Sequence, residues 1–290
     1  METETIKKPS KIGAFFYGLL AMAVYLIIVS IPQLLVLAPI IVQANVESAG
    51  DVQKYTEIYM QLLGESADKI TISTAVGTVL AVIVTVIWFY FGVYKKKKAA
   101  GTIEKVGPKL KNAKSIIFLV SAAIAGNAVA TLIMDFLLTL MPTVASNYVN
   151  SMNTVMGGVQ LLGTILAVVL APIGEELCLR GIVMNRTQKS FGLVGCIVLS
   201  GIFFGIYHLN PIQGIYAIPM GMVFGYISYK YKSVIPSIIA HFINNVAALF
   251  LGILYTTWYS TLIVIVVFGA IAVIFAGKLD FLKKDNAITE

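Results

Sequence analysis

Residues 156–184 read MGGVQLLGTILAVVLAPIGEELCLRGIVM, an apolar run that holds two glutamates and an arginine in its second half. About 20 consecutive apolar residues are enough for a helix to cross the ~30 Å hydrocarbon core of a bilayer. Ionisable residues inside such a span are costly and usually functional. The stretch therefore predicts a membrane helix with a polar site at Glu175, Glu176 and Arg180.

The same apolar character extends over the whole chain of 290 residues. Hydrophobic residues make up 58% of it and charged residues 12%, with a mean hydropathy of +0.89, whereas a soluble domain carries about 25% charged residues. We predict an all-α polytopic membrane helix bundle with about eight transmembrane helices, forming one integral membrane domain over residues 1–290. The predicted spans are 13–43, 71–94, 115–141, 156–184, 192–209, 213–230, 234–256 and 258–277.

Lysine and arginine are distributed unevenly between the predicted loops. With the N-terminus in the cytoplasm, eighteen of the 21 cationic residues fall in inner segments, and only Lys54 and Lys69 in outer ones. Cytoplasmic loops carry such an excess, so both termini are expected in the cytoplasm. The net charge of +7 is thus a topology signal and does not point to nucleic acid. The basic loop 95–114 is expected to lie against membrane lipids.

The fifth and sixth predicted spans are short and are joined by Asn210-Pro211, which predicts a tight or partly re-entrant hairpin. Each contains two glycines four residues apart, Gly201 with Gly205 and Gly221 with Gly225. Small residues at this spacing allow helices in membranes to approach closely. We therefore expect close packing between these two spans.

The charged residues of the fourth span have a spacing that separates their roles. Glu176 and Arg180 are four residues apart with the acid first, the favourable order for an ion pair on a helix. Glu175 is rotated from Glu176 by ~100°, so Arg180 neutralises one glutamate and leaves the other free. A carboxylate left unpaired in an apolar cavity is a stronger proton acceptor, as a general base must be.

The chain has two histidines, His208 and His241, and both fall in predicted spans. His241 and Asn245 are four residues apart, so they project from one helix face. Counted from the inner ends of their spans, Glu175, His241 and Asn245 lie at ~12–18 Å depth and His208 at ~24 Å. A single membrane histidine is more often a packed, hydrogen-bonding residue, but two of them with a glutamate pair indicate one wet, buried cavity that opens to the cytoplasm.

Two further polar residues of the third span, Asn127 and Asp135, are interpreted as structural. An amide such as Asn127 commonly joins membrane helices by hydrogen bonds. Asp135 lies near the outer end of its span, where a carboxylate can reach the interface.

At these residues the sequence resembles the CAAX prenyl-protease and bacteriocin-processing (CPBP or Abi) family of intramembrane proteases. Three motifs carry the resemblance, in order and on separate spans. They are Glu175-Glu176-x-x-x-Arg180, Phe204-x-x-x-His208 and His241-x-x-x-Asn245. The resemblance covers about residues 160–250, which we interpret as the catalytic core, and the first three spans carry no motif.

The resemblance implies an endopeptidase that hydrolyses peptide bonds within the membrane. By resemblance, Glu175 activates a water that His208 helps to orient, and His241 and Asn245 stabilise the oxyanion. Glu176 and Arg180 then support the site, although Glu176 could share the role of base. A general base with donors aimed at the developing negative charge is what amide hydrolysis needs.

Metal use is left open by the sequence. Members of the family are often labelled metalloproteases, and Glu175, His208 and His241 are plausible zinc ligands with an open coordination position. The chain has no His-Glu-x-x-His pair, which would have favoured zinc. A divalent metal such as zinc is therefore interpreted as not obligatory.

Two other classes of function remain open. One is a non-catalytic membrane protein of the same fold, such as a bacteriocin-immunity or scaffold protein. The other is a transporter, since intramembrane glutamate and histidine also serve there, although the absence of an internal repeat disfavours it. We expect a peptide or membrane-protein substrate and a bacterial plasma membrane.

Overall fold

The computed structural model describes residues 9–144, 146, 148–150 and 158–283. Within this part of the chain every regular element is a helix and there is no strand. Five helical runs are long and apolar enough to cross a membrane: Lys11–Ser48, Ala67–Ala99, Ala113–Leu140, Gln160–Tyr207 and Trp258–Lys278. The protein is thus a polytopic membrane helix bundle, as predicted, while the count of eight spans stays a prediction.

The first half of the chain forms α1 (Lys11–Ser48), α2 (Val52–Glu65), α3 (Ala67–Phe89) with a π-helical extension η1 (Tyr90–Tyr94), α4 (Lys95–Ala99), α5 (Val106–Leu110) and α6 (Ala113–Leu140). The second half forms α8 (Gln160–Ile165), η2 (Leu166–Leu170), α9 (Ala171–Glu176), η3 (Leu177–Val183), α10 (Met184–Tyr207), α11 (Pro211–Tyr231), α12 (Ile235–Phe250), η4 (Gly252–Tyr255) and α13 (Trp258–Lys278).

The structure changes the boundary between the predicted fourth and fifth spans. Helical structure continues past residue 184 to Phe191, and the break falls at Gly192, whose φ of 68° and ψ of −167° are not helical. A positive φ is strained for residues with a Cβ but not for glycine, so the chain changes direction at this residue. The predicted junction at Asn210-Pro211 is confirmed, because α10 ends at Tyr207 and Asn210 caps α11 through its side chain.

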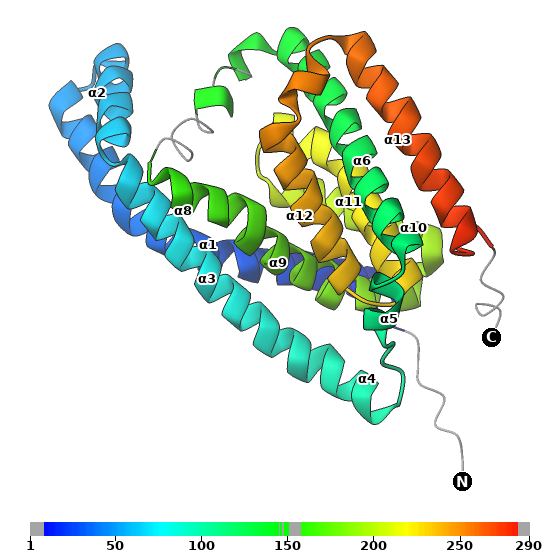
Figure 1. The fold of residues 1–290 in the computed structure, drawn as a ribbon. Coiled ribbons are helices and arrows are strands. Elements are labelled where there is room, and N and C mark those ends of the chain that lie inside the picture. Colours follow the sequence, from blue (N-terminus) through cyan, green and yellow to red (C-terminus); the bar gives the residue numbers. More distant parts are fainter. Residues whose placement is uncertain (1–8, 145, 147, 151–157, 284–290) are drawn as a thin grey trace.

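The helices pack in pairs around a central segment (Figure 1). α1 packs along α3, α10 along α11, and α6 against both α11 and α13. The run that contains α8 and α9 lies between the α1–α3 pair and α12 in Figure 1. This central position places the charged residues of α9 and η3 among helices from both halves of the chain.

Contacts among the described residues bring several cation-rich segments to one end of the bundle. Glu104, in the loop between α4 and α5, forms ion pairs with Lys109 at 3.2 Å and with Lys232, at the C-terminus of α11, at 3.6 Å. These contacts hold the pKa of the Glu104 carboxyl below its usual value, mainly through Lys109. The Lys230 Nζ donates to the carbonyl of Lys283, beyond α13. Such a cationic end is expected at the cytoplasmic face of a membrane protein.

The expected close packing of α10 and α11 is confirmed by their glycines. A Cβ added to Gly201 would lie 2.6 Å from the Ile218 carbonyl oxygen, and one added to Gly221 would lie 2.8 Å from Gly201 Cα. Backbone atoms are in contact here because neither residue has a side chain. The contact fixes α11 against the part of α10 that leads to His208.

Gly201→Ala is expected to lower the free energy of unfolding by about 1–3 kcal/mol, because the new methyl group overpacks a backbone contact. The matched control is Gly269→Ala on α13, where an added Cβ meets no atom within 4 Å. There the substitution should be neutral or stabilising by about 0.5–1 kcal/mol. Thermal unfolding in detergent micelles measures both, and equal midpoints would contradict the packing argument.

Candidate active site

The central run departs from regular α-helix on both sides of the two glutamates. The π-helical segments η2 and η3 flank the short α9, which ends at Glu176. Pro172 lacks an N–H and cannot donate to the carbonyl of Val168, four residues earlier, so the helix widens before it. π-helical turns of this kind are frequent at functional sites. The sequence signalled the proline but not the two π-helical segments.

Glu176 occupies the centre of a buried polar cluster. Its Oε1 accepts a hydrogen bond from Arg180 Nη1 at 2.8 Å, which confirms the predicted ion pair. The same oxygen also lies 3.0 Å from Nδ1 of His241, on α12. Both the Glu176 and the Arg180 side chains are 0% exposed. One carboxylate oxygen therefore joins a cation on η3 to an imidazole on another helix.

Arg180 is held by three kinds of contact. Besides its ion pair, its Nη2 donates to the Gly221 carbonyl at 2.7 Å. Its guanidinium carbon lies 4.9 Å from the centre of the Phe204 ring and 5.5 Å from that of Phe224. Cations are attracted to aromatic faces, and more strongly when water is excluded. This packing keeps the positive charge next to Glu176 in an apolar environment.

His241 lies between the two glutamates. A carboxylate only accepts hydrogen bonds, so the contact with Glu176 places a proton on Nδ1 and leaves Nε2 facing Glu175. The distance from Nε2 to Glu175 Oε2 is 3.8 Å. The ring also stacks on Phe224, with centroids 4.6 Å apart and planes 20° apart. Glu176 and Phe224 together fix which nitrogen points at Glu175.

Glu175 is 6% exposed, and Arg180 does not neutralise it directly. The Tyr207 side chain lies within hydrogen-bonding reach of it, and the Tyr207 ring packs on Tyr25 of α1 with centroids 5.5 Å apart. The Tyr25 hydroxyl closely approaches Gly174, where no side chain intervenes. The predicted division between a paired and an unpaired glutamate matches this geometry, whereas Tyr207 and Tyr25 were not among the predicted site residues.

Asn245 belongs to a chain of amides that crosses three helical segments. Its Nδ2 donates to the Ala167 carbonyl on η2 at 2.7 Å, and its Oδ1 accepts from Asn244 Nδ2 at 2.8 Å. Asn127 on α6 donates in turn to Asn244 Oδ1 at 3.2 Å. Asn127 thus joins helices, as predicted. The role of Asn244 was missed, because its only signal in the sequence is its position beside Asn245.

His208 is the least connected of the predicted site residues. It caps the C-terminus of α10, and its ring packs against Phe204 and Tyr207 with centroid distances of 4.9 and 5.4 Å. Among the described residues, no hydrogen bond joins its ring to Glu175 or Glu176. It reaches the cluster through Phe204, whose ring also contacts His241 at 5.5 Å. Asp135 is exposed on α6 and lies outside the cluster.

The candidate zinc ligands do not assemble into a metal site. Within the part of the chain that the structure describes, no three His, Cys, Asp or Glu side chains are grouped closely enough to hold a metal ion. Glu175 and His241 are near each other, but His208 is not grouped with them. We therefore derive no step through a metal.

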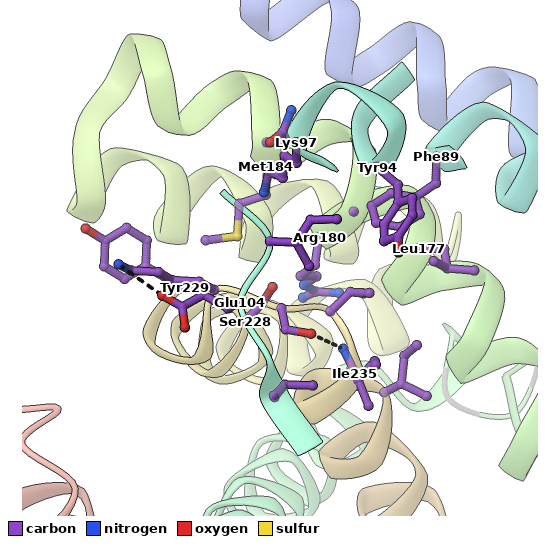
Figure 2. A pocket seen from close by; sticks show the side chains of 18 of the residues that line it. Phe89, Tyr94, Lys97, Glu104, Leu177, Arg180, Met184, Ser228, Tyr229 and Ile235 are labelled. Carbon is purple, nitrogen blue, oxygen red and sulfur yellow. Dashed lines mark hydrogen bonds and ion pairs between the residues drawn. The ribbon is translucent and has the colours of Figure 1, made fainter. Parts of the chain in front are cut away.

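A cavity of about 1010 Å³ reaches the cluster from the cation-rich end of the bundle. Figure 2 shows Arg180 among the side chains that line it, with Glu104 on a segment that crosses the cavity. Glu175, Glu176 and His241 are not part of its lining. Arg180 therefore separates the cavity from the two glutamates and the histidine.

Arg180→Met is expected to lower the free energy of unfolding by about 3–5 kcal/mol, because it leaves the Glu176 carboxylate buried without its cation. Adding Glu176→Gln to this variant should recover part of the loss. The control, Lys109→Met, breaks an exposed ion pair with Glu104 that contributes at most about 1 kcal/mol. Thermal unfolding in detergent compares them, and equal losses for Arg180→Met and Lys109→Met would refute the central role of the buried pair.

Comparison with known proteins finds a match over the segment that holds most of this cluster. Residues 157–247 match the family model described as Rce1-like, type II CAAX prenyl endopeptidase. The match includes all three motifs and every residue of the cluster except Tyr25 and Asn127. No curated protein and no solved structure matches the chain. Residues 157–247 are thus identified as an Rce1-like segment, similar to type II CAAX prenyl endopeptidases, and the family resemblance predicted from the motifs is confirmed.

Proposed function

We propose that the protein is an intramembrane endopeptidase in which Glu175 activates the attacking water. The observation that carries the proposal is the position of His241, whose Nδ1 is fixed by Glu176 at 3.0 Å while its Nε2 faces Glu175 Oε2 at 3.8 Å. This separation is too long for a direct hydrogen bond. We propose that one water, at about 2.8 Å from each atom, bridges them.

In the proposed reaction, Glu175 accepts a proton from this water as its oxygen attacks the peptide carbonyl carbon. Glu175 then transfers the proton to the departing amine nitrogen as the C–N bond breaks. The carboxylate is thus regenerated, and the products are a new carboxyl terminus and a new amine. Tyr207 keeps Glu175 oriented, and His208 orients the water from beside Phe204.

The oxyanion of the tetrahedral intermediate is stabilised in this proposal by His241 and Asn245. In this role His241 donates from Nε2 while its Nδ1 stays in contact with Glu176. Asn245 has a second Nδ2 hydrogen besides the one that bonds Ala167. Its Oδ1 is held by Asn244, so the amide presents N–H groups and not its oxygen.

The substrate is proposed to be a peptide or membrane protein that reaches the site from the cytoplasmic side of a bacterial plasma membrane. One observation supports this orientation. The contacts of Glu104 and Lys230 gather cation-rich segments at one end of the bundle, and such segments are typical of the cytoplasmic face. The description of the matching family favours a prenylated peptide as the first probe.

Glu175→Gln is expected to reduce hydrolysis of a farnesylated CAAX peptide by at least about 10²-fold, because the amide cannot accept the proton. Purified protein in detergent would be assayed by mass spectrometry, with a library of unprenylated peptides in parallel. Asp135→Asn is the matched control, since its carboxylate lies outside the cluster. Both variants should unfold at the wild-type temperature.

Hydrolysis that survives Glu175→Gln would sink the proposed mechanism. If the wild-type protein is folded but cleaves no peptide, the result would instead favour a non-catalytic membrane protein of the same fold.

Hydrolysis is expected to persist after dialysis against a metal chelator, because the proposed proton transfer uses Glu175 as the base and involves no metal ion. The measurement pairs peptide cleavage with elemental analysis of the purified protein. Loss of cleavage together with release of stoichiometric zinc would contradict the proposal, because removing a required metal from its site lowers both the metal content and the activity.

A further inference from the structure

The cavity at the cation-rich end has apolar walls. They are formed by Phe89 at the end of α3, Leu177 and Met184 near η3, and Ile235 and Ile238 at the start of α12. Its volume of about 1010 Å³ is at the upper end of the range of small-molecule sites, about 300–1,000 Å³. The cavity can therefore hold an amphiphilic molecule with part of an acyl chain.

Two apolar residues of the lining are well exposed. Ile235 is 47% exposed and Ile103, on the crossing segment, is 37% exposed. Both residues line the cavity as well. Their exposed apolar surface is therefore available to an acyl chain inside the cavity.

The polar part of the lining is strongly cationic. Lys97, Arg180, Lys230 and Lys232 line the cavity, against a single carboxylate, Glu104. That carboxylate is already engaged by Lys109 and Lys232. Lys97 forms no ion pair with any residue that the structure describes. The like charge of Lys189 repels it. The excess positive charge favours an anionic ligand.

Arg180 supplies a second, independent indication of a ligand. Its side chain is 0% exposed, although the residue is among those that line the cavity. The Nε atom is buried and has no hydrogen-bond partner among the described residues. A buried donor without a partner is costly, and an oxygen of a bound anion would satisfy it without disturbing the bonds of Nη1 and Nη2.

We propose that this cavity is a binding site for an acidic phospholipid, with its phosphate among Lys97, Lys232 and Arg180 and its acyl chain along the apolar wall. The cavity lies where helices end in lysine clusters, and such clusters attract anionic lipid headgroups. A lipid is favoured over a peptide because the wall is apolar and Glu104, the carboxylate among the lining residues, is already paired with lysines. The proposal does not depend on peptidase activity.

Binding is tested by native mass spectrometry of the delipidated protein in detergent, titrated with phosphatidylglycerol or phosphatidylcholine. We expect one saturable phosphatidylglycerol site and much weaker binding of phosphatidylcholine. The double variant Lys97→Gln with Lys232→Gln should raise the dissociation constant about 30-fold, or about fivefold for each lysine.

Two matched double variants distinguish binding in the cavity from general electrostatic attraction of the lipid to lysines elsewhere on the protein. Lys96→Gln with Lys111→Gln removes two cations from the same end of the bundle that do not line the cavity. Lys54→Gln with Lys69→Gln removes two from the other end of the molecule, at the start of α2 and at the start of α3 (Figure 1). Both should bind phosphatidylglycerol as the wild type does.

Three results would overturn the proposal. The first is an equal loss of lipid binding in the Lys96 and Lys111 variant, which would make the attraction diffuse. The second is displacement of the lipid by millimolar inorganic phosphate, which would show that the acyl chain contributes nothing. The third is displacement by the farnesylated CAAX peptide at a concentration where a phosphatidylcholine control has no effect, which would assign the cavity to a peptide.

Discussion

The structure depends on one carboxylate oxygen that is buried away from solvent. Glu176 Oε1 accepts from Arg180 on η3 and from His241 on α12, so two helical segments are joined through a single buried atom. A buried charge is tolerated only when it is paired and hydrogen-bonded, which makes the positions of Arg180 and His241 interdependent. The phenylalanines at 204 and 224 complete this arrangement, because they pack on both the guanidinium and the imidazole.

The consequence of this constraint is a difference between two adjacent glutamates. Glu176 is held between a cation and an imidazole, whereas Glu175 faces the remaining imidazole nitrogen across 3.8 Å. Neighbouring residues on a helix point about 100° apart, so the same short α9 directs one carboxylate to the ion pair and the other to Nε2 of His241. The amide chain from Asn127 to Asn245 then fixes the far side of the cluster to η2, the segment just before α9.

Sequence reasoning reached the parts of this site that depend on local spacing. The four-residue interval between Glu176 and Arg180 was sufficient to predict their pairing, and intramembrane charge was sufficient to identify the span. The contact between Glu176 and His241 joins residues 65 positions apart, and no local period encodes such a distance. The π-helical turns were missed for a related reason, since a period of 3.6 residues was assumed throughout. A break between the fourth and fifth spans was predicted, but the residues just before Gly192 are helical and do not form a loop.

Arg180 belongs both to the buried cluster and to the lining of the cavity. Its spacing from Glu176 in the sequence predicts the first of these positions but not the second. A guanidinium has five donors in a fixed plane, and here Nη1 and Nη2 serve the cluster while Nε is unpaired. An anion on the cavity side would therefore add a bond without removing one. It would also restrict the motion of the side chain that positions Glu176. Since coupling between two sites is reciprocal, a more rigid Glu176–His241 contact would in turn favour occupancy of the cavity.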